Sequence, residues 1–135
     1  MSKFSKRAAL AGLLIGLAGM LYAQAPALTR TIVTRADVSV PGREAVLTRV
    51  SISPGGAAGW HTHPGDEISY VAEGELSLMV AGQPTRKVVP GEGFVIPAGT
   101  VHNARNETAA AVNLVGVYVV EKGQPLATPA SAPSP

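Results

Sequence analysis

The sequence predicts an all-β protein with a single folded domain, in which short strands form a sandwich or a closed barrel. Three observations support this fold class. The chain has 135 residues, and two unusual terminal segments leave roughly 100 for the fold, a common size for one domain. Glycine and proline are abundant, with 15 and 11 copies. They divide the chain into short apolar runs, a pattern typical of β-sandwiches and β-barrels.

The beginning of the chain has the layout of a secretory signal peptide. Three cations lie among the first seven residues, and residues 8–23 then carry no charge (AALAGLLIGLAGMLYA). A basic start, an apolar stretch and small residues at a cleavage site occur in this order in exported proteins. We therefore predict a signal peptide at residues 1–23, with the cut between Ala23 and Ala27.

The charge-free run is short for a membrane anchor. Spanning a bilayer takes roughly 20 apolar residues, and the run reaches that length only by including Gln24 and Pro26. Because the chain has no cysteine, it also offers no site for a lipoprotein anchor. The sequence thus predicts an exported protein without stable membrane insertion after cleavage, periplasmic in a Gram-negative bacterium and secreted otherwise.

The predicted strands follow one another over residues 28–122. Residues 28–40 are rich in threonine and valine and are expected to form an edge strand before the turn at Pro41-Gly42. Residues 44–52 alternate, which places Val46, Thr48, Val50 and Ile52 on one side and Arg49 on the other. Shorter runs follow between glycines and prolines, at residues 60–63, 67–71, 76–80, 86–89, 94–96 and 111–120.

The last residues differ in composition from this domain. Residues 123–135 (GQPLATPASAPSP) are rich in proline, alanine and serine and carry no charged side chain. A segment with so little apolar side-chain surface cannot offset the entropy lost on ordering. We therefore predict a disordered tail.

Charge and cysteine content limit the possible functions. The formal net charge is +2, and removal of the three cations of the predicted signal peptide leaves −1. Binding to nucleic acid is not expected, because it requires an excess of positive charge. Since cysteine is absent, a metal site would have to use nitrogen and oxygen ligands.

All three histidines of the chain belong to one pattern. His61 and His63 are two residues apart, so in a strand their imidazoles project from the same face, roughly 6.5–7 Å apart along the backbone. Glu67 follows Pro64-Gly65, a pair of residues typical of turns, so the chain can bend there and return the carboxylate to the two imidazoles. His102 follows the tight turn at residues 97–99. These four residues are the candidate ligands of one metal ion.

Strand parity separates these candidates from their neighbours. Asp66 is expected to point away from the site that Glu67 faces, and Trp60 away from the site that His61 faces. Trp60 is therefore interpreted as a packing or interface residue. Asn106 is expected to fix a turn, and Tyr70 and Met79 are interpreted as packing residues.

The spacing of these residues extends over two blocks. The first is Gly55, five residues, His61-Thr62-His63, three residues, Glu67, six residues, Gly74; the second is Gly91, five residues, Pro97-Ala98-Gly99, two residues, His102, three residues, Asn106. In these blocks the chain resembles the cupin superfamily, whose motifs G(X)5HXH(X)3E(X)6G and G(X)5PXG(X)2H(X)3N match at every position. Residues 75–90 between them have the length found in compact bacterial members.

The resemblance implies a small antiparallel, jelly-roll-like β-barrel over residues 28–122. It implies one divalent transition metal ion inside the barrel, bound by His61, His63, Glu67 and His102, and glycines at the turns between strands. It also makes a homodimer plausible, with the apolar run at residues 111–120 available for its interface.

Several functions fit such a site. Neutral imidazoles and a carboxylate suit iron(II), manganese(II), nickel(II), copper(II) or zinc(II). The resemblance to small quercetin-dioxygenase-like and germin-like cupins favours oxygen-dependent oxidation of a small organic molecule, with Glu67 as a ligand or, when released, a catalytic base. The alternatives are a cupin isomerase or decarboxylase and a non-catalytic protein that binds a metal or a small ligand, since fold does not decide function.

Apolar residues of the predicted strands are candidates for the lining of a substrate pocket: Val71, Leu76, Leu78, Val80, Phe94, Ile96, Val115 and Val117. Such a lining disfavours a phosphosugar, which would need several converging cations. Arg49 and Arg105 are the basic candidates nearest to the motifs, and a solvated surface position is the alternative for both.

Overall fold

The structure is a computed structural model that describes residues 26–134. The predicted signal peptide at residues 1–23 lies outside the described residues. Strands are the regular elements of the described part: β1 (Leu28–Asp37), β2 (Arg43–Ile52), β3 (His61–Thr62), β4 (Gly65–Glu73), β5 (Leu76–Val80), β6 (Arg86–Val88), β7 (Gly93–Ile96), β8 (His102–Arg105), β9 (Val112–Glu121) and β10 (Thr128–Pro129). Over this range, no helix has the length and apolar character needed to cross a membrane.

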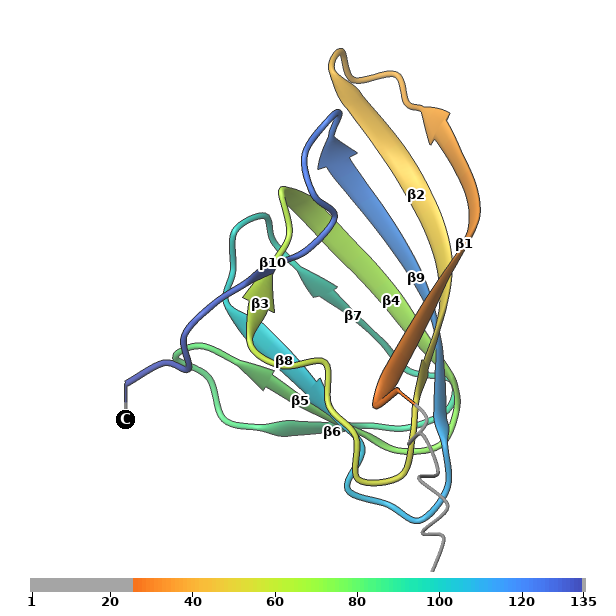
Figure 1. Cartoon of the computed structure of the whole chain (residues 1–135), viewed down its shortest axis with the longest axis vertical. Helices are drawn as coiled ribbons and strands as arrows, with labels where there is room; N and C mark the ends of the chain where they lie inside the picture. The colour runs from red at the N-terminus through yellow and green to blue at the C-terminus, as the bar shows by residue number, and fades with distance from the viewer. Residues whose placement is uncertain (1–25, 135) are drawn as a thin grey trace, which may run out of the picture.

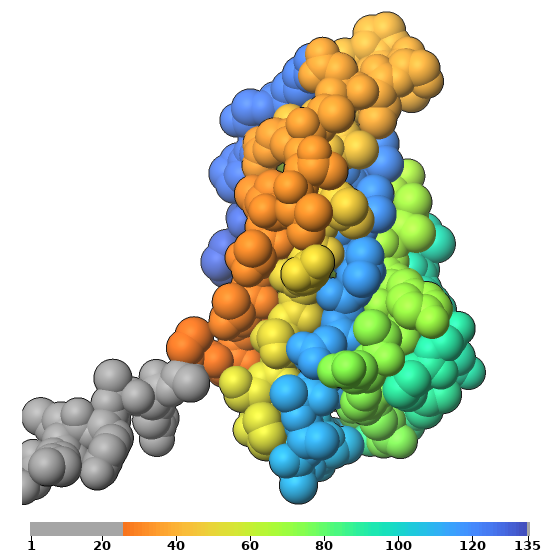
Figure 2. All heavy atoms as spheres, turned by 90° about the vertical axis from the view of Figure 1, so that its right-hand side faces the viewer, coloured from red at the N-terminus to blue at the C-terminus, as the bar shows by residue number. Residues whose placement is uncertain are grey.

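The strands form two five-stranded antiparallel sheets that face each other (Figure 1). The larger sheet has the order β1-β2-β9-β4-β7, and the smaller one has the order β10-β3-β8-β5-β6. Figure 2 shows the outside of the larger sheet, where β1, β2, β9 and β4 lie side by side. The all-β, jelly-roll-like prediction is confirmed, although hydrogen bonding among residues 26–134 divides the strands into two sheets and does not close one barrel.

The alternation of side chains along each strand explains which residues of the larger sheet are buried. In β2, Val46, Thr48, Val50 and Ile52 are buried and Arg49 is exposed, as predicted. The strand β1 lies at the sheet edge, also as predicted, and pairs only with β2. The central strand β9 pairs with both β2 and β4 over most of its length. Its alternate residues are therefore buried between the sheets.

The core lies between the two sheets. Its main cluster includes Val50, Ile52, Leu76, Leu78 and Phe94, which come from both sheets. A smaller cluster contains Val46, Tyr118 and Val120, with Leu126 packed against it. These clusters hold the sheets together by burial of apolar surface.

The prediction of a disordered tail is wrong for residues 126–130. The strand β10 pairs with β3, and Ala130 N donates to Trp60 O at 2.9 Å. The composition of the tail did not reveal this pairing, because backbone hydrogen bonds do not depend on side-chain type and β3 offers an open edge. The single apolar anchor Leu126 adds side-chain packing.

Candidate metal centre

Three strands and one loop bring the four candidate ligands together. His61 lies in β3 directly opposite His102, the first residue of β8. His63 follows β3, and Glu67 lies in β4. The short connection works because Gly65 packs against the backbone of β9, where a Cβ atom would clash with Val119 O. The chain can therefore turn sharply after His63 and return Glu67 to the same point.

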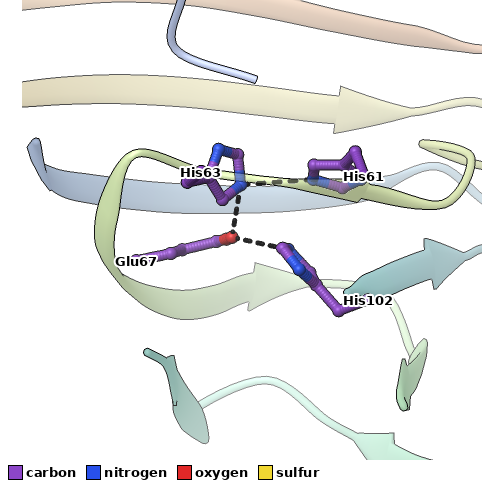
Figure 3. Close-up of side chains that lie close together, drawn as sticks. All are labelled: His61, His63, Glu67 and His102. Carbon is purple, nitrogen blue, oxygen red and sulfur yellow. Dashed lines mark hydrogen bonds and ion pairs between the residues drawn. The ribbon is translucent and has the colours of Figure 1, made fainter. Parts of the chain in front are cut away.

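The side chains converge closely (Figure 3). All four are buried, and one possible ligand atom from each lies within 4.8 Å of the others. Glu67 Oε2 is 3.0 Å from His63 Nε2 and 3.1 Å from His102 Nε2. His61 Nε2 is 3.2 Å from His63 Nε2. The structure thus brings together every residue that the sequence proposed for the metal site.

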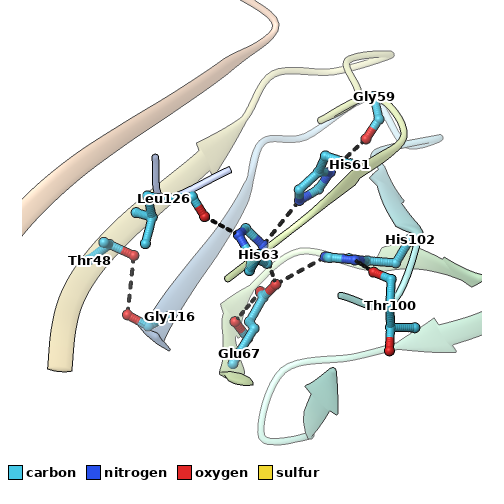
Figure 4. A network of polar contacts seen from close by, with 10 residues as sticks. Thr48, Gly59, His61, His63, Glu67, Thr100, His102, Gly116 and Leu126 are labelled. Atoms are coloured by element: carbon cyan, nitrogen blue, oxygen red, sulfur yellow. Dashed lines mark hydrogen bonds and ion pairs between the residues drawn. The ribbon is translucent and has the colours of Figure 1, made fainter. Parts of the chain in front are cut away.

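Backbone carbonyls orient each imidazole (Figure 4). The Nδ1 atom of His61 contacts Gly59 O at 2.7 Å, that of His102 contacts Thr100 O at 2.9 Å, and that of His63 contacts Leu126 O at 2.6 Å. A neutral imidazole has one N–H, and here each ring donates it to a carbonyl. The three Nε2 lone pairs therefore face the centre of the group, the arrangement found in histidine metal ligands.

The three Nε2 lone pairs and the carboxylate cannot hydrogen-bond to one another, because all four are acceptors. A cation must lie between them, either protons on some of the rings or a metal ion. Burial, the largest effect, lowers the pKa of His61 to about 4, although its contact with Gly59 O acts in the opposite direction. At neutral pH that ring is uncharged and available to bind a metal.

The spacing of the donor atoms fits a divalent metal ion. Neighbouring ligand atoms lie about 3.0 Å apart on an octahedral ion with bonds of about 2.1 Å, and about 3.4 Å apart on a tetrahedral ion. The three contacts in the group measure 3.0, 3.1 and 3.2 Å. These three distances lie in the range expected for neighbouring ligands of one ion, so one divalent ion could bind all four groups at once.

Glu67 is held by a residue that the sequence reasoning missed. The buried Ser69 donates from Oγ to Glu67 Oε1 at 2.6 Å, which leaves Oε2 directed at the histidines. Burial acts to raise the pKa of Glu67, but the contacts with His102, His63 and Ser69 together hold it below its ordinary value. The sequence did carry a sign of this contact, because Ser69 lies two residues after Glu67 and therefore on the same face of the strand.

A cavity of about 20 Å³ adjoins the candidate ligands and has room for about one water molecule. Leu78 and Phe94 line it, as predicted. The other six predicted lining residues do not line this cavity. Val71, Leu76 and Ile96 are buried in the core, and Val80 is partly buried against it. Val115 is exposed on the outside of its sheet, and Val117 is partly buried.

Two residues of this cavity, Arg30 and Tyr118, were also missed. The guanidinium carbon of Arg30 lies 5.4 Å from the centre of the Tyr118 ring, which lies 4.7 Å from the His63 ring. Burial, with a smaller contribution from the charge of Glu67, raises the pKa of Tyr118 to about 12, so the phenol stays protonated. By contrast, the predicted candidates Arg49 and Arg105 are exposed.

Residues next to the candidate ligands lie where the sequence predicted them. Asp66 points away from it and accepts a hydrogen bond from Ala98 N at 3.0 Å. Asn106 fixes the turn after β8, as expected, because its Nδ2 donates to Ile52 O and Ala110 O. The motif glycines Gly74 and Gly91 have φ of 76° and 93°, as expected for turns.

Comparisons with known proteins agree with this fold and site. Residues 48–121 match the family model described as a cupin domain. The chain is 39% identical over 93 residues to nectarin-1 of Nicotiana langsdorffii x Nicotiana sanderae, covering 61% of this chain and 41% of that protein. It is 39% identical over 59 residues to acireductone dioxygenase of Rhodopseudomonas palustris, covering 42% of this chain and 36% of the enzyme. The chain thus spans less than half the length of these curated relatives.

A solved structure of oxalate oxidase in complex with the substrate analogue glycolate is also similar. It shares 28% sequence identity and superposes with a TM-score of 0.57, over 71% of this chain and 52% of the oxidase. The family model covers more than half of the chain, and the two-sheet fold and the four converging residues agree with it. The chain therefore belongs to the cupin family.

Proposed function

We propose that this protein is an exported, metal-dependent oxidase or oxygenase that acts on a small organic molecule. The observation that carries the proposal is the convergence of three imidazole lone pairs and one carboxylate beside a cavity. Similarity to an oxalate oxidase and to an acireductone dioxygenase supports oxygen-dependent chemistry. The N-terminal sequence layout supports export.

The candidate ligands would hold one divalent transition metal ion: His61, His63, Glu67 and His102. When bound, iron, manganese, nickel or copper would supply Lewis-acid and redox chemistry, and zinc would supply Lewis-acid chemistry alone. The protein fixes the imidazoles through the carbonyls of Gly59, Thr100 and Leu126. Those contacts keep the rings oriented before any ion arrives.

Glu67 has a second proposed role as a proton acceptor. It is the only carboxylate in the converging group. Ser69 holds Oε1, so movement at Oε2 could free one oxygen without release of the whole side chain. Its lowered pKa keeps it ionised at neutral pH, as metal binding requires, and the same contacts with His102 and His63 make it a weak base. The proposed proton transfer therefore requires that Oε2 first leave these contacts.

A non-catalytic metal-binding protein is the second candidate. The small volume beside the ligands, about 20 Å³, favours it, because a protein that only binds an ion needs no room for an organic substrate there. The same four residues would serve either function. Metal content alone therefore cannot separate the two candidates.

Elemental analysis of the mature protein from its native compartment, combined with oxygen uptake, tests the proposal. We expect about one transition metal ion per chain and oxygen consumption with a member of a panel of flavonols, dicarboxylates and diketones. The variants His61→Ala and His102→Ala should lose the metal, while the exposed control Arg49→Gln should keep it. Stoichiometric metal without turnover would favour the binding protein, and unchanged metal content in both histidine variants would overturn the site.

A further inference from the structure

A larger cavity of about 270 Å³ lies beside the inner one and shares Leu28, Arg30, Ala58 and His61 with it. Its walls come from β1, the loop before β3 and the ordered part of the tail. We call this cavity the vestibule. Because the two cavities have these residues in common, a molecule in the vestibule would lie next to His61.

Arg30 is the only lining residue of the vestibule with a permanent formal charge. Its Nε atom is buried and has no hydrogen-bond partner within residues 26–134. A buried donor without a partner is costly, and guanidinium groups pair best with a planar, two-oxygen anion. The buried Nε lies out of reach of a ligand in the vestibule, so such a ligand would pair with the part of the guanidinium that lines the vestibule, beside its contact with Tyr118.

The surroundings of Arg30 favour one class of anion. The guanidinium lies over the Tyr118 ring, which limits its movement. The rest of the vestibule lining is mainly apolar and includes Trp60, so the ligand would have an organic part. A single cation among apolar neighbours suits a carboxylate, whereas a phosphate group commonly needs several cations.

We propose that Arg30 binds the carboxylate of a small organic acid in the vestibule, with the rest of the acid directed toward His61 and the metal centre. The statement that this acid is the substrate rests on the proposed function. The binding itself requires Arg30 and the vestibule. Arg30 is thus assigned as the specificity-determining residue of the site.

Trp60 provides a direct readout of binding. It lines the vestibule and is the only tryptophan in the chain, so its fluorescence reports occupancy without any turnover. The metal-loaded protein is titrated at constant ionic strength with two pairs of probes, lactate with lactamide and phenylacetate with phenylacetamide. Each pair differs in the carboxylate group alone. The variants are Arg30→Gln, Arg30→Lys and the exposed control Arg49→Gln.

We expect at least one acid to bind more tightly than its amide, and Arg30→Gln to weaken that acid on the order of tenfold or more. Arg30→Lys should keep part of the preference because it keeps the charge, and Arg49→Gln should behave like the wild type. Unchanged metal content and melting temperature would show that Arg30→Gln is folded. No preference for either acid, or equal binding by Arg30→Gln, overturns the proposal.

Oxygen uptake measured on the same samples separates this inference from the proposed function. Binding that depends on Arg30 without oxygen uptake supports the vestibule site and shows that the bound probe is not a substrate, and the oxidase is then contradicted only if the panel of flavonols, dicarboxylates and diketones also gives no uptake. Oxygen uptake that is unaffected by Arg30→Gln supports the oxidase and overturns the role of Arg30.

Discussion

At the scale of single residues, the metal centre depends on main-chain atoms as much as on side chains. Each imidazole is oriented by a carbonyl oxygen, from Gly59, Thr100 or Leu126. A carbonyl is present whatever the residue type, so substitutions at these three positions keep the acceptor as long as the backbone keeps its path. The orientation of the ligands is therefore a property of the fold.

The lowered pKa of His61 leads to a prediction about stability in acid. In the folded, metal-free protein this pKa is about 4, against 6.5 for the unfolded reference. Between these values the unfolded chain binds a proton that the folded chain does not, so the free energy of unfolding falls as the pH falls from 6.5 to 4. The loss from this residue is at most about 3.4 kcal/mol, and solvent screening reduces it. The lowered pKa of Glu67 acts in the same direction at lower pH.

Urea unfolding of the metal-free protein between pH 7 and pH 4 measures this effect. His61→Asn should show a shallower dependence on pH over this window, because the titrating group is removed. Arg49→Gln should retain the wild-type slope. If the wild type and His61→Asn lose stability in parallel, His61 does not cause the pH dependence.

At the scale of elements, the ordered tail contributes to the metal centre. Leu126 O accepts from His63 Nδ1, Leu126 packs against the smaller core cluster that contains Tyr118, and β10 pairs with β3 at His61. Deletion of residues 124–135 should therefore weaken metal binding by about 10–100-fold, the usual effect of losing a group that orients a ligand.

Competition with a chelator measures the affinity of the truncated protein. Deletion of residues 131–135 alone is the matched control, because it leaves β10 and the Ala130–Trp60 hydrogen bond in place. Equal metal affinity in both truncated proteins would show that the tail does not orient His63.

Two motif glycines allow a test of turn geometry. Both have positive φ, but a Cβ at Gly74 would lie 2.6 Å from Ala111 O, whereas one at Gly91 would meet nothing within 4 Å. Gly91→Ala should cost about 1–3 kcal/mol of stability from backbone strain. Gly74→Ala should cost more because a steric clash is added. Chemical denaturation compares the two, and equal losses would contradict the steric contribution.

At the scale of the whole molecule, the outer face of the larger sheet carries an apolar patch of Ile68, Tyr70, Val95 and Val115. These side chains are 47%, 50%, 62% and 39% exposed. Ile68 pairs with Val95, and Tyr70 pairs with Val115, so they are neighbours on one face. Contiguous exposed apolar surface commonly marks an interface. We therefore propose that two copies pair through this patch, which includes the outward face of β9.

Light scattering during size-exclusion chromatography tests the homodimer. The wild type should have twice the mass of one chain, and Ile68→Lys with Val115→Lys should reduce it to the mass of one chain. Val33→Lys, also an exposed apolar position of the larger sheet, should leave the dimer intact. A wild type with the mass of a single chain would contradict the proposal.

The sequence by itself predicted most of the strands, the buried face of β2 and the four residues that converge. These features are local, because the burial of Val46 and Val50 follows from alternation along one strand, and the joint position of His61, His63 and Glu67 follows from short spacing. His102 is different, because it reaches His61 through the pairing of β3 with β8. Its place in the predicted ligand set came from the match to the second cupin motif.

Only the tertiary structure decided which residues surround that site. Arg30, Tyr118 and Leu126 reach it from distant parts of the chain, through the register of β1 on β2, of β2 on β9 and of β10 on β3. A shift of one residue in any of these pairings would turn the side chains of that strand to the opposite face. Long-range pairing of this kind depends on the packing of both sheets, so the spacing along the chain could not predict it.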